Sequence, residues 1–200
     1  MRGPPIILLA VSAITSACAV PLGMQNTTGP SAGETVTGLP LPGYGTLRQE
    51  EVSIALTSGD LRLLVTPLEE SVTLVTAPDT YRRLSTLAAA HQVTAGVGAT
   101  LFLVQFFSER PDVRFVPEEV QLVSRSLRVR PSRIIPVTPT WGERRLKQRE
   151  TEMAVYAFEA GIDLESDLTL VYGLDQTTAW NVILTRVQAE RARARARGRF

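Results

Sequence analysis

The sequence predicts a mainly β protein, a single β-sandwich with one short helix. Three observations lead to this fold class. Short segments of branched and aromatic apolar residues recur from about Leu47 onward, and several alternate between apolar and polar positions. Gly, Pro or charged residues separate these segments, as is typical of turns. Hydrophobic residues make up 44% of the 200 residues, a proportion typical of globular proteins.

The first predicted element is a hairpin. Val52, Ile54 and Leu56 occupy alternate positions, which places them on one face of a strand. Residues 57–60 then read Thr-Ser-Gly-Asp, a sequence that favours a turn. The alternation resumes over residues 61–65, so two antiparallel strands should pair across this turn.

A short strand and the helix come next. Residues 72–75 are rich in β-branched side chains and predict a strand that ends before Pro78. Asp79 is expected to cap the helix, because its carboxylate can accept hydrogen bonds from the first free backbone amides. The helix is predicted over residues 80–91, where apolar residues follow one stripe at helical spacing.

The remaining apolar segments predict a central strand and several shorter ones. Residues 101–107 are apolar on both faces except at Gln105, as expected of a strand that is covered on each side. Further strands are predicted over residues 113–115, 120–123, 127–129, 134–137, 153–158, 168–172 and 180–187. Those at 153–158 and 168–172 are expected to pair as a hairpin. This spacing is immunoglobulin-like in organisation, although the Cys…Trp…Cys core of antibody domains is absent.

The N-terminal residues 1–19 have the three-part layout of a secretory signal peptide. Arg2 supplies a positive charge, residues 6–14 form an apolar run, and residues 15–19 are small. A helix needs roughly 20 apolar residues to cross a bilayer, so this run is too short to be a membrane span. The segment therefore predicts export.

The residues at the end of this segment predict how the chain is processed. Thr15-Ser16-Ala17-Cys18 resembles the lipobox of bacterial lipoproteins, in which small residues precede a cysteine, and it departs from that pattern at Thr15, where Leu is usual. The resemblance covers four residues. It implies that Cys18 receives a diacylglyceryl group, becomes the mature N-terminus and anchors the protein to a membrane. The alternative is cleavage after Ala19, which would release a soluble, secreted chain.

Two segments flank the predicted domain, which spans residues 47–188. Residues 20–46 are rich in Gly and Pro and predict a flexible linker. Residues 189–200 form an arginine-rich C-terminal tail. The basic residues of this region are Arg186, Arg191, Arg193, Arg195, Arg197 and Arg199, with Glu190 as the one acidic residue. In an exported chain these arginines are expected to contact anionic lipid headgroups or lipopolysaccharide, and no nucleic acid is expected.

Charge and residue counts exclude several kinds of chemistry. The formal net charge of +1 gives no bulk attraction to nucleic acid. A single Cys and a single His exclude both a disulfide framework within the chain and a Cys/His zinc cluster. The sequence contains no G-x-S-x-G motif with which His91 could act as a catalytic base. His91 is instead expected to end the predicted helix. No cofactor and no metal site are therefore expected.

Acidic residues offer two weaker candidates. Glu69-Glu70 and Glu118-Glu119 could form the paired-carboxylate site that sugar hydrolysis requires. Asp163, Glu165 and Asp167 alternate along the chain and could offer oxygen ligands to calcium. Solvated loops are the more common explanation of both sets, so the sequence predicts no catalytic residue.

Together these patterns predict an exported, membrane-anchored lipoprotein of the cell envelope. It is expected to act as a non-enzymatic binding or structural module with an envelope protein as partner. Two alternatives stay open, an exported enzyme that acts on envelope polysaccharide through carboxylates and a periplasmic carrier of a small ligand. An enzyme should show two carboxylates of shifted pKa in a concave site, and a carrier should show a cavity of roughly 300 Å³ or more.

Overall fold

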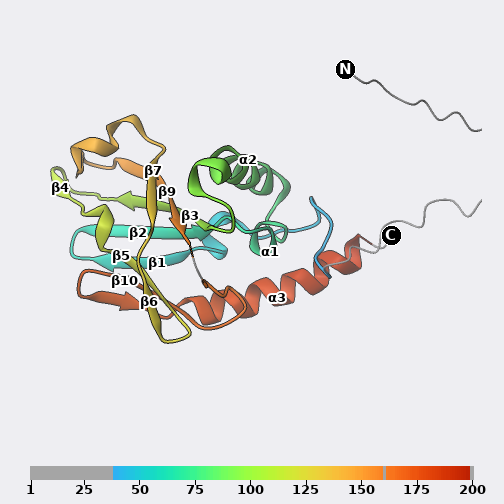
Figure 1. Ribbon diagram of the computed structural model, residues 1–200. Helices are drawn as coiled ribbons and strands as arrows, with labels where there is room; N and C mark the ends of the chain where they lie inside the picture. The colour runs from blue at the N-terminus through green and yellow to red at the C-terminus, as the bar shows by residue number, and fades with distance from the viewer. Residues whose placement is uncertain (1–37, 160, 199–200) are drawn as a thin grey trace, which may run out of the picture. The chain divides into compact units, whose positions relative to one another are not determined.

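A computed structural model of the protein describes residues 38–159 and 161–198. Within these residues the predicted mainly β, sandwich-like fold is confirmed, with strands arranged in three antiparallel sheets (Figure 1). The largest sheet contains, in spatial order, β1 (Ile54–Ser58), β2 (Leu61–Pro67), β3 (Thr100–Phe107), β9 (Thr151–Phe158) and β7 (Arg133–Pro136). The second contains β11 (Asp175–Thr177), β10 (Leu168–Tyr172), β5 (Val120–Ser124) and β6 (Leu127–Val129). The third pairs β4 (Val113–Arg114) with β8 (Arg145–Leu146).

Helical segments connect and cover these sheets. The α-helices are α1 (Glu70–Thr73), α2 (Pro78–Ala95) and α3 (Trp180–Arg197). Three short 3-10 helices are η1 (Gln49–Glu51), η2 (Pro117–Glu119) and η3 (Pro139–Glu143). In Figure 1, α2 lies over one side of the large sheet and α3 runs along the other side of the domain.

The large sheet buries a different set of side chains on each face. Alternate residues such as Leu63, Phe102 and Tyr156 face the second sheet, in a core that also includes Trp180 of α3. The residues between them, including Leu103, face Leu84 and the other buried residues of α2. The domain therefore has three layers, consisting of α2, the large sheet, and the second sheet with α3.

Two of the predicted elements are confirmed in detail. Gly59 and Asp60 form the turn between β1 and β2, and Thr57 and Ser58 are the last residues of β1. Gly59 has a φ of 57°, a backbone conformation that favours glycine. Residues 101–107 lie in β3, which pairs with β2 on one side and β9 on the other. The strand is central because both of its edges are bonded and both of its faces are covered.

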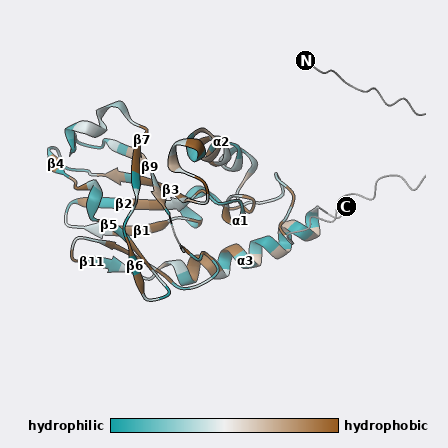
Figure 2. Cartoon of the chain, viewed as in Figure 1, coloured by the Kyte–Doolittle hydropathy of each residue, from teal (hydrophilic) through white to brown (hydrophobic). Residues whose placement is uncertain are grey.

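The prediction that residues 180–187 form a strand is wrong, because they begin α3. Val182, Ile183 and Leu184 favour a strand locally, but the buried residues of this segment recur at helical spacing: Trp180, Ile183, Val187, Glu190 and Ala194. In Figure 2 this helix shows alternating hydrophobic and hydrophilic bands. Residues 189–197 of the predicted arginine-rich tail continue the same helix.

Three further predictions are corrected. Residues 72–75 form no strand: α1 ends at Thr73, and the backbone amides of Val72 and Thr73 donate to the carbonyl of Glu69 at 3.0 and 2.9 Å. The predicted helix at 80–91 is longer and begins at Pro78, so Asp79 lies in its first turn. The strands β9 and β10 do not pair as a hairpin but belong to different sheets, whose apolar faces meet in one core.

Candidate functional site

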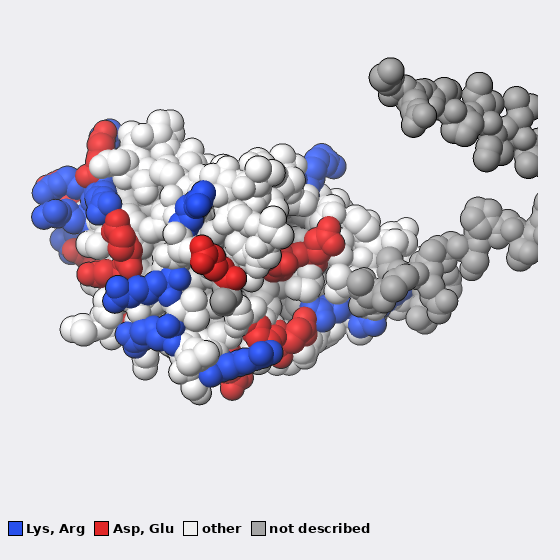
Figure 3. Space-filling view, in the orientation of Figure 1, with Lys and Arg blue, Asp and Glu red and all other residues white. Residues whose placement is uncertain are grey.

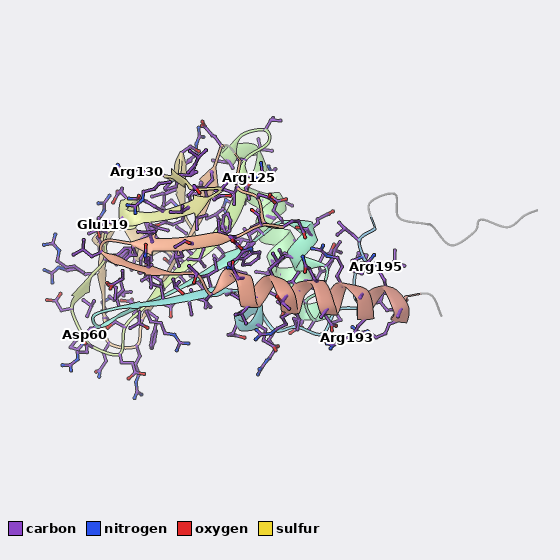
Figure 4. All side chains as sticks on the ribbon, turned by 90° about the horizontal axis from the view of Figure 1, so that it is seen from below. Asp60, Glu119, Arg125, Arg130, Arg193 and Arg195 are labelled. Atoms are coloured by element: carbon purple, nitrogen blue, oxygen red, sulfur yellow. The ribbon has the colours of Figure 1, made fainter. Side chains whose placement is uncertain are left out.

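The predicted site residues on α3 point in several directions. Cys18 and Arg199 lie outside the described residues, so lipidation of Cys18 stays a prediction. Arginines at alternate positions of a helix project to different sides, because each turn takes 3.6 residues. Figure 4 shows Arg193 and Arg195 on different sides of α3 near its C-terminal end. The helix therefore does not place all its arginines on one binding face.

Two of the predicted arginines bind other parts of the domain. The Nη2 atom of Arg191 donates to the carbonyl of Ser71 at 2.9 Å and to the carboxylate of Glu165 at 2.8 Å. Its side chain is only 13% exposed. Arg186 donates to the carbonyl of Glu51 at 3.0 Å. Both contacts join α3 to other parts of the domain; they leave the side chain of Arg191 largely buried, whereas Arg186 remains exposed.

A buried carboxylate, Glu190, joins the end of α3 to the first described residues of the chain. The hydroxyl of Thr46 donates to its Oε1 at 2.8 Å, Arg197 pairs with the same oxygen, and Arg193 lies 3.6 Å from Oε2. Burial opposes ionisation of Glu190, but the hydrogen bonds from Thr46 and Arg197 outweigh it and lower the pKa of Glu190. Arg197 also donates to the carbonyl of Tyr44 at 3.0 Å.

The last part of the predicted linker is therefore packed on the domain. A Cβ atom on Gly38 would lie 3.9 Å from Nη1 of Arg195, so the chain enters the domain beside the C-terminal end of α3. Gly45 approaches the backbone of Val75 so closely that a Cβ atom there would lie 2.1 Å from a carbonyl carbon. Residues 38–46 thus follow a fixed path along the helix end.

The remaining predicted candidates are separated in the fold. Asp163 pairs with Arg125 at 2.6 Å, and the hydrogen bond from Arg125 lowers the pKa of Asp163. Glu118 pairs with Arg144 at 2.6 Å and is not among the described residues that line the pocket containing Glu69. His91 lies inside α2 and not at its end. Within residues 38–159 and 161–198, no group of three or more His, Cys, Asp or Glu side chains could hold a metal ion.

Both tryptophans are core residues. Trp141 packs against the rings of Phe106, Phe115 and Tyr156, with centroid distances of 5.7, 5.2 and 6.3 Å. The indole of Trp180 is fully buried and donates to the carbonyl of Leu164 at 3.2 Å. That bond fixes the loop between β9 and β10 against α3.

This loop forms one wall of a surface pocket of about 440 Å³. The other walls come from the start of α1, the end of α2 and the loop that leads into β3. The residues that line it are Glu69, Ser71, Gln92, Gly98, Ala99, Thr100, Ile162, Leu164 and Glu165. Two carboxylates from distant parts of the chain therefore share one concave site.

The pKa values of the two carboxylates are shifted in opposite directions. Burial raises the pKa of Glu69, and the neighbouring charge of Glu70 acts in the same direction. The hydrogen bond from Arg191 lowers the pKa of Glu165. Different protonation behaviour in one pocket is a common feature of functional sites. The sequence pattern predicts Glu69 in a pair with Glu118-Glu119, because nothing local brings residue 165 to residue 69.

Charged side chains elsewhere on the surface are mixed in sign. On the face shown in Figure 3, basic and acidic residues are interspersed and form no large patch of one charge. Among the helices of the described residues, none combines the length and apolar character that crossing a membrane requires. The sequence matches no protein-family model, and neither a curated protein nor a solved structure matches it.

Proposed function

We propose that this protein is an exported lipoprotein of the cell envelope, anchored through Cys18, whose β domain is a non-enzymatic binding module. The observation that carries the proposal is the position at which the chain enters the domain. Gly38 lies beside Arg195, at the arginine-rich end of α3. A lipid on Cys18 would therefore hold this cationic end of the domain nearest to the membrane.

The exposed arginines fit this orientation. Arg193 is 68% exposed and Arg197 is 41% exposed, even though both approach Glu190. Arg195 is also exposed, and its Nε atom donates to the carbonyl of Arg191 in the same helix. Each basic residue near an anionic membrane contributes about 1 kcal/mol to binding, which adds to the anchoring by the acyl chains. Anionic lipid and lipopolysaccharide both present suitable phosphates.

The lipid anchor is tested by the intact mass of the mature protein. The protein is expressed in a bacterial host, extracted from membranes and compared with the Cys18→Ser variant. The proposal expects a chain that begins at Cys18 and carries an acyl mass that the variant lacks. A soluble chain that begins near Val20 would contradict it and support plain secretion.

The cationic end is tested with vesicles. In the full chain carrying Cys18→Ser, the double variant Arg193→Gln/Arg195→Gln should bind vesicles containing phosphatidylglycerol about thirtyfold more weakly, from about 1 kcal/mol per arginine. The control Arg128→Gln/Arg130→Gln removes two exposed arginines near β6, and Figure 4 shows Arg130 far from Arg195. Equal binding by both double variants would contradict the proposed orientation.

A second candidate function is hydrolysis of envelope polysaccharide. It is supported by the opposite pKa shifts of Glu69 and Glu165 in one pocket, which suit a general acid and a base. The full chain would be incubated with purified peptidoglycan and the release of reducing ends measured. Release that Glu69→Gln abolishes would establish an enzyme, and release no greater than the buffer background would exclude this activity on that polymer.

A further inference from the structure

The pocket that contains Glu69 and Glu165 carries an unbalanced negative charge. Two of its lining residues are glutamates, and none of the described lining residues is Lys, Arg or His. Arg191 is not among the residues that line the pocket, but it forms a 2.8 Å ion pair with Glu165 and neutralises that carboxylate. Among the ion pairs of the described residues, none includes Glu69. One half-buried carboxylate is therefore left without a cation.

The rest of the lining is suited to hydroxyl groups. In the described part of the chain, no hydrogen bond engages the side chains of Ser71, Gln92 or Thr100. These groups can donate and accept hydrogen bonds from a ligand. Ile162 and Leu164 add a small apolar surface on the loop wall. A volume of about 440 Å³ is within the usual range for small-molecule sites, which is roughly 300–1,000 Å³.

These features indicate which charge and which functional groups a ligand of this pocket should have. An anion would be repelled by Glu69, and an apolar molecule would leave the hydroxyl and amide groups of the wall unpaired. A cation next to Glu69 would supply the counter-charge that the protein does not provide. The raised pKa of Glu69 is consistent with this charge balance, because burial and the neighbouring charge of Glu70 raise it more than a backbone hydrogen bond from Leu101 lowers it.

We propose that this pocket binds a small hydroxylated organic cation of the amino-sugar type. Its ammonium group contacts Glu69, and its hydroxyls contact Glu165, Ser71, Gln92 and Thr100. The inference rests on the proposed binding function and gives it a ligand class. It does not require the lipid anchor, so a failure to bind amino sugars would leave the anchoring of Cys18 untouched, and a secreted chain could still bind them.

The test compares two sugars that differ in charge. The full chain carrying Cys18→Ser is labelled with ¹⁵N and titrated with glucosamine and, separately, with N-acetylglucosamine, which lacks the positive charge. Glucosamine should shift the amide signals of Gly98, Thr100 and Leu164 in a saturable manner. N-acetylglucosamine should bind at least tenfold more weakly. Equal affinity for both sugars, or shifts elsewhere on the domain only, would overturn the proposal.

A matched pair of variants locates the interaction. Glu69→Gln keeps the shape of the side chain and removes its charge, so glucosamine affinity should fall about ten- to a hundredfold, the range for a hydrogen bond to a charged group. Glu143→Gln makes the same change at an exposed residue of η3 outside the pocket and should leave affinity unchanged. A loss of affinity in both variants would indicate non-specific charge attraction and contradict the assigned site.

Discussion

The hydroxyl of Thr46 donates a 2.8 Å hydrogen bond to the carboxylate of Glu190, and so joins the segment before the first strand to the last helix of the domain. Glu190 is only 2% exposed and also forms an ion pair with Arg197. Arg197 in turn donates a hydrogen bond to the carbonyl of Tyr44. This contact lies at the end of residues 38–46, which run beside the C-terminal end of α3. The hydrogen bond and ion pair of Glu190 therefore hold the last residues of the predicted linker against α3.

Replacing the charge of Glu190 should weaken this contact. In Glu190→Gln, Thr46 keeps an acceptor but Arg197 and Arg193 lose their carboxylate partner. We expect the free energy of unfolding to fall by about 1–2 kcal/mol, a modest value because both guanidinium groups still reach water. Urea unfolding of the full chain measures it. A change equal to that of the exposed control Glu143→Gln would show that the contact contributes nothing to stability.

Gly45 should tolerate no side chain. In Gly45→Ala the new Cβ atom would meet the carbonyl carbon of Val75 at 2.1 Å, and that backbone is held by the parallel bridge between Leu47 and Thr76. We expect a loss of about 3 kcal/mol, the upper end of the usual range for overpacking. Gly142→Ala is the matched control, because its Cβ would meet nothing within 4 Å. Thermal unfolding that places both variants at the same midpoint would disprove the close approach.

Acid should destabilise the domain through its paired carboxylates. The pKa values of Glu190, Glu165 and Asp163 are all lowered in the folded protein. Their stabilising contribution is therefore complete above the unfolded pKa values of about 4 and is lost as the pH falls through the lower folded values. Urea midpoints measured from pH 7 to pH 3 should fall in the acidic range. Glu190→Gln should show a smaller fall than the wild type, since one of the three groups is gone.

Glu69 should behave in the opposite way. Its folded pKa is raised, so its contribution to stability is present below the unfolded pKa and is lost as the pH rises through the folded value. Glu69→Gln should therefore be more stable than the wild type at pH 7, by less than about 1 kcal/mol because the side chain is partly exposed. The gain should disappear near pH 3, where Glu69 is protonated in both states. A variant less stable than wild type at pH 7 would contradict a net destabilising effect of burying the charge of Glu69.

The candidate site could be predicted only in part. The sequence marks both Glu69 and Glu165 as acidic candidates, but it pairs Glu69 with Glu118-Glu119 and groups Glu165 with Asp163 and Asp167. Two walls of their shared pocket are joined by Arg191. Its Nη2 atom donates hydrogen bonds to the carboxylate of Glu165 and to the carbonyl of Ser71. Because these contacts join residues that are far apart in sequence, no local pattern could indicate them.

Elements that depend on neighbouring residues alone can be predicted from the sequence. The β1–β2 hairpin follows from alternation and the turn at Gly59, and the central position of β3 follows from its apolar residues on both faces. Only the tertiary structure decided which strands pair, since β9 bonds to β3 and β7 and not to the strand that follows it. It also decided that Val182, Ile183 and Leu184 are helical. Their weak local preference for a strand was overridden because a helix buries Trp180, Ile183 and Val187 together against the core.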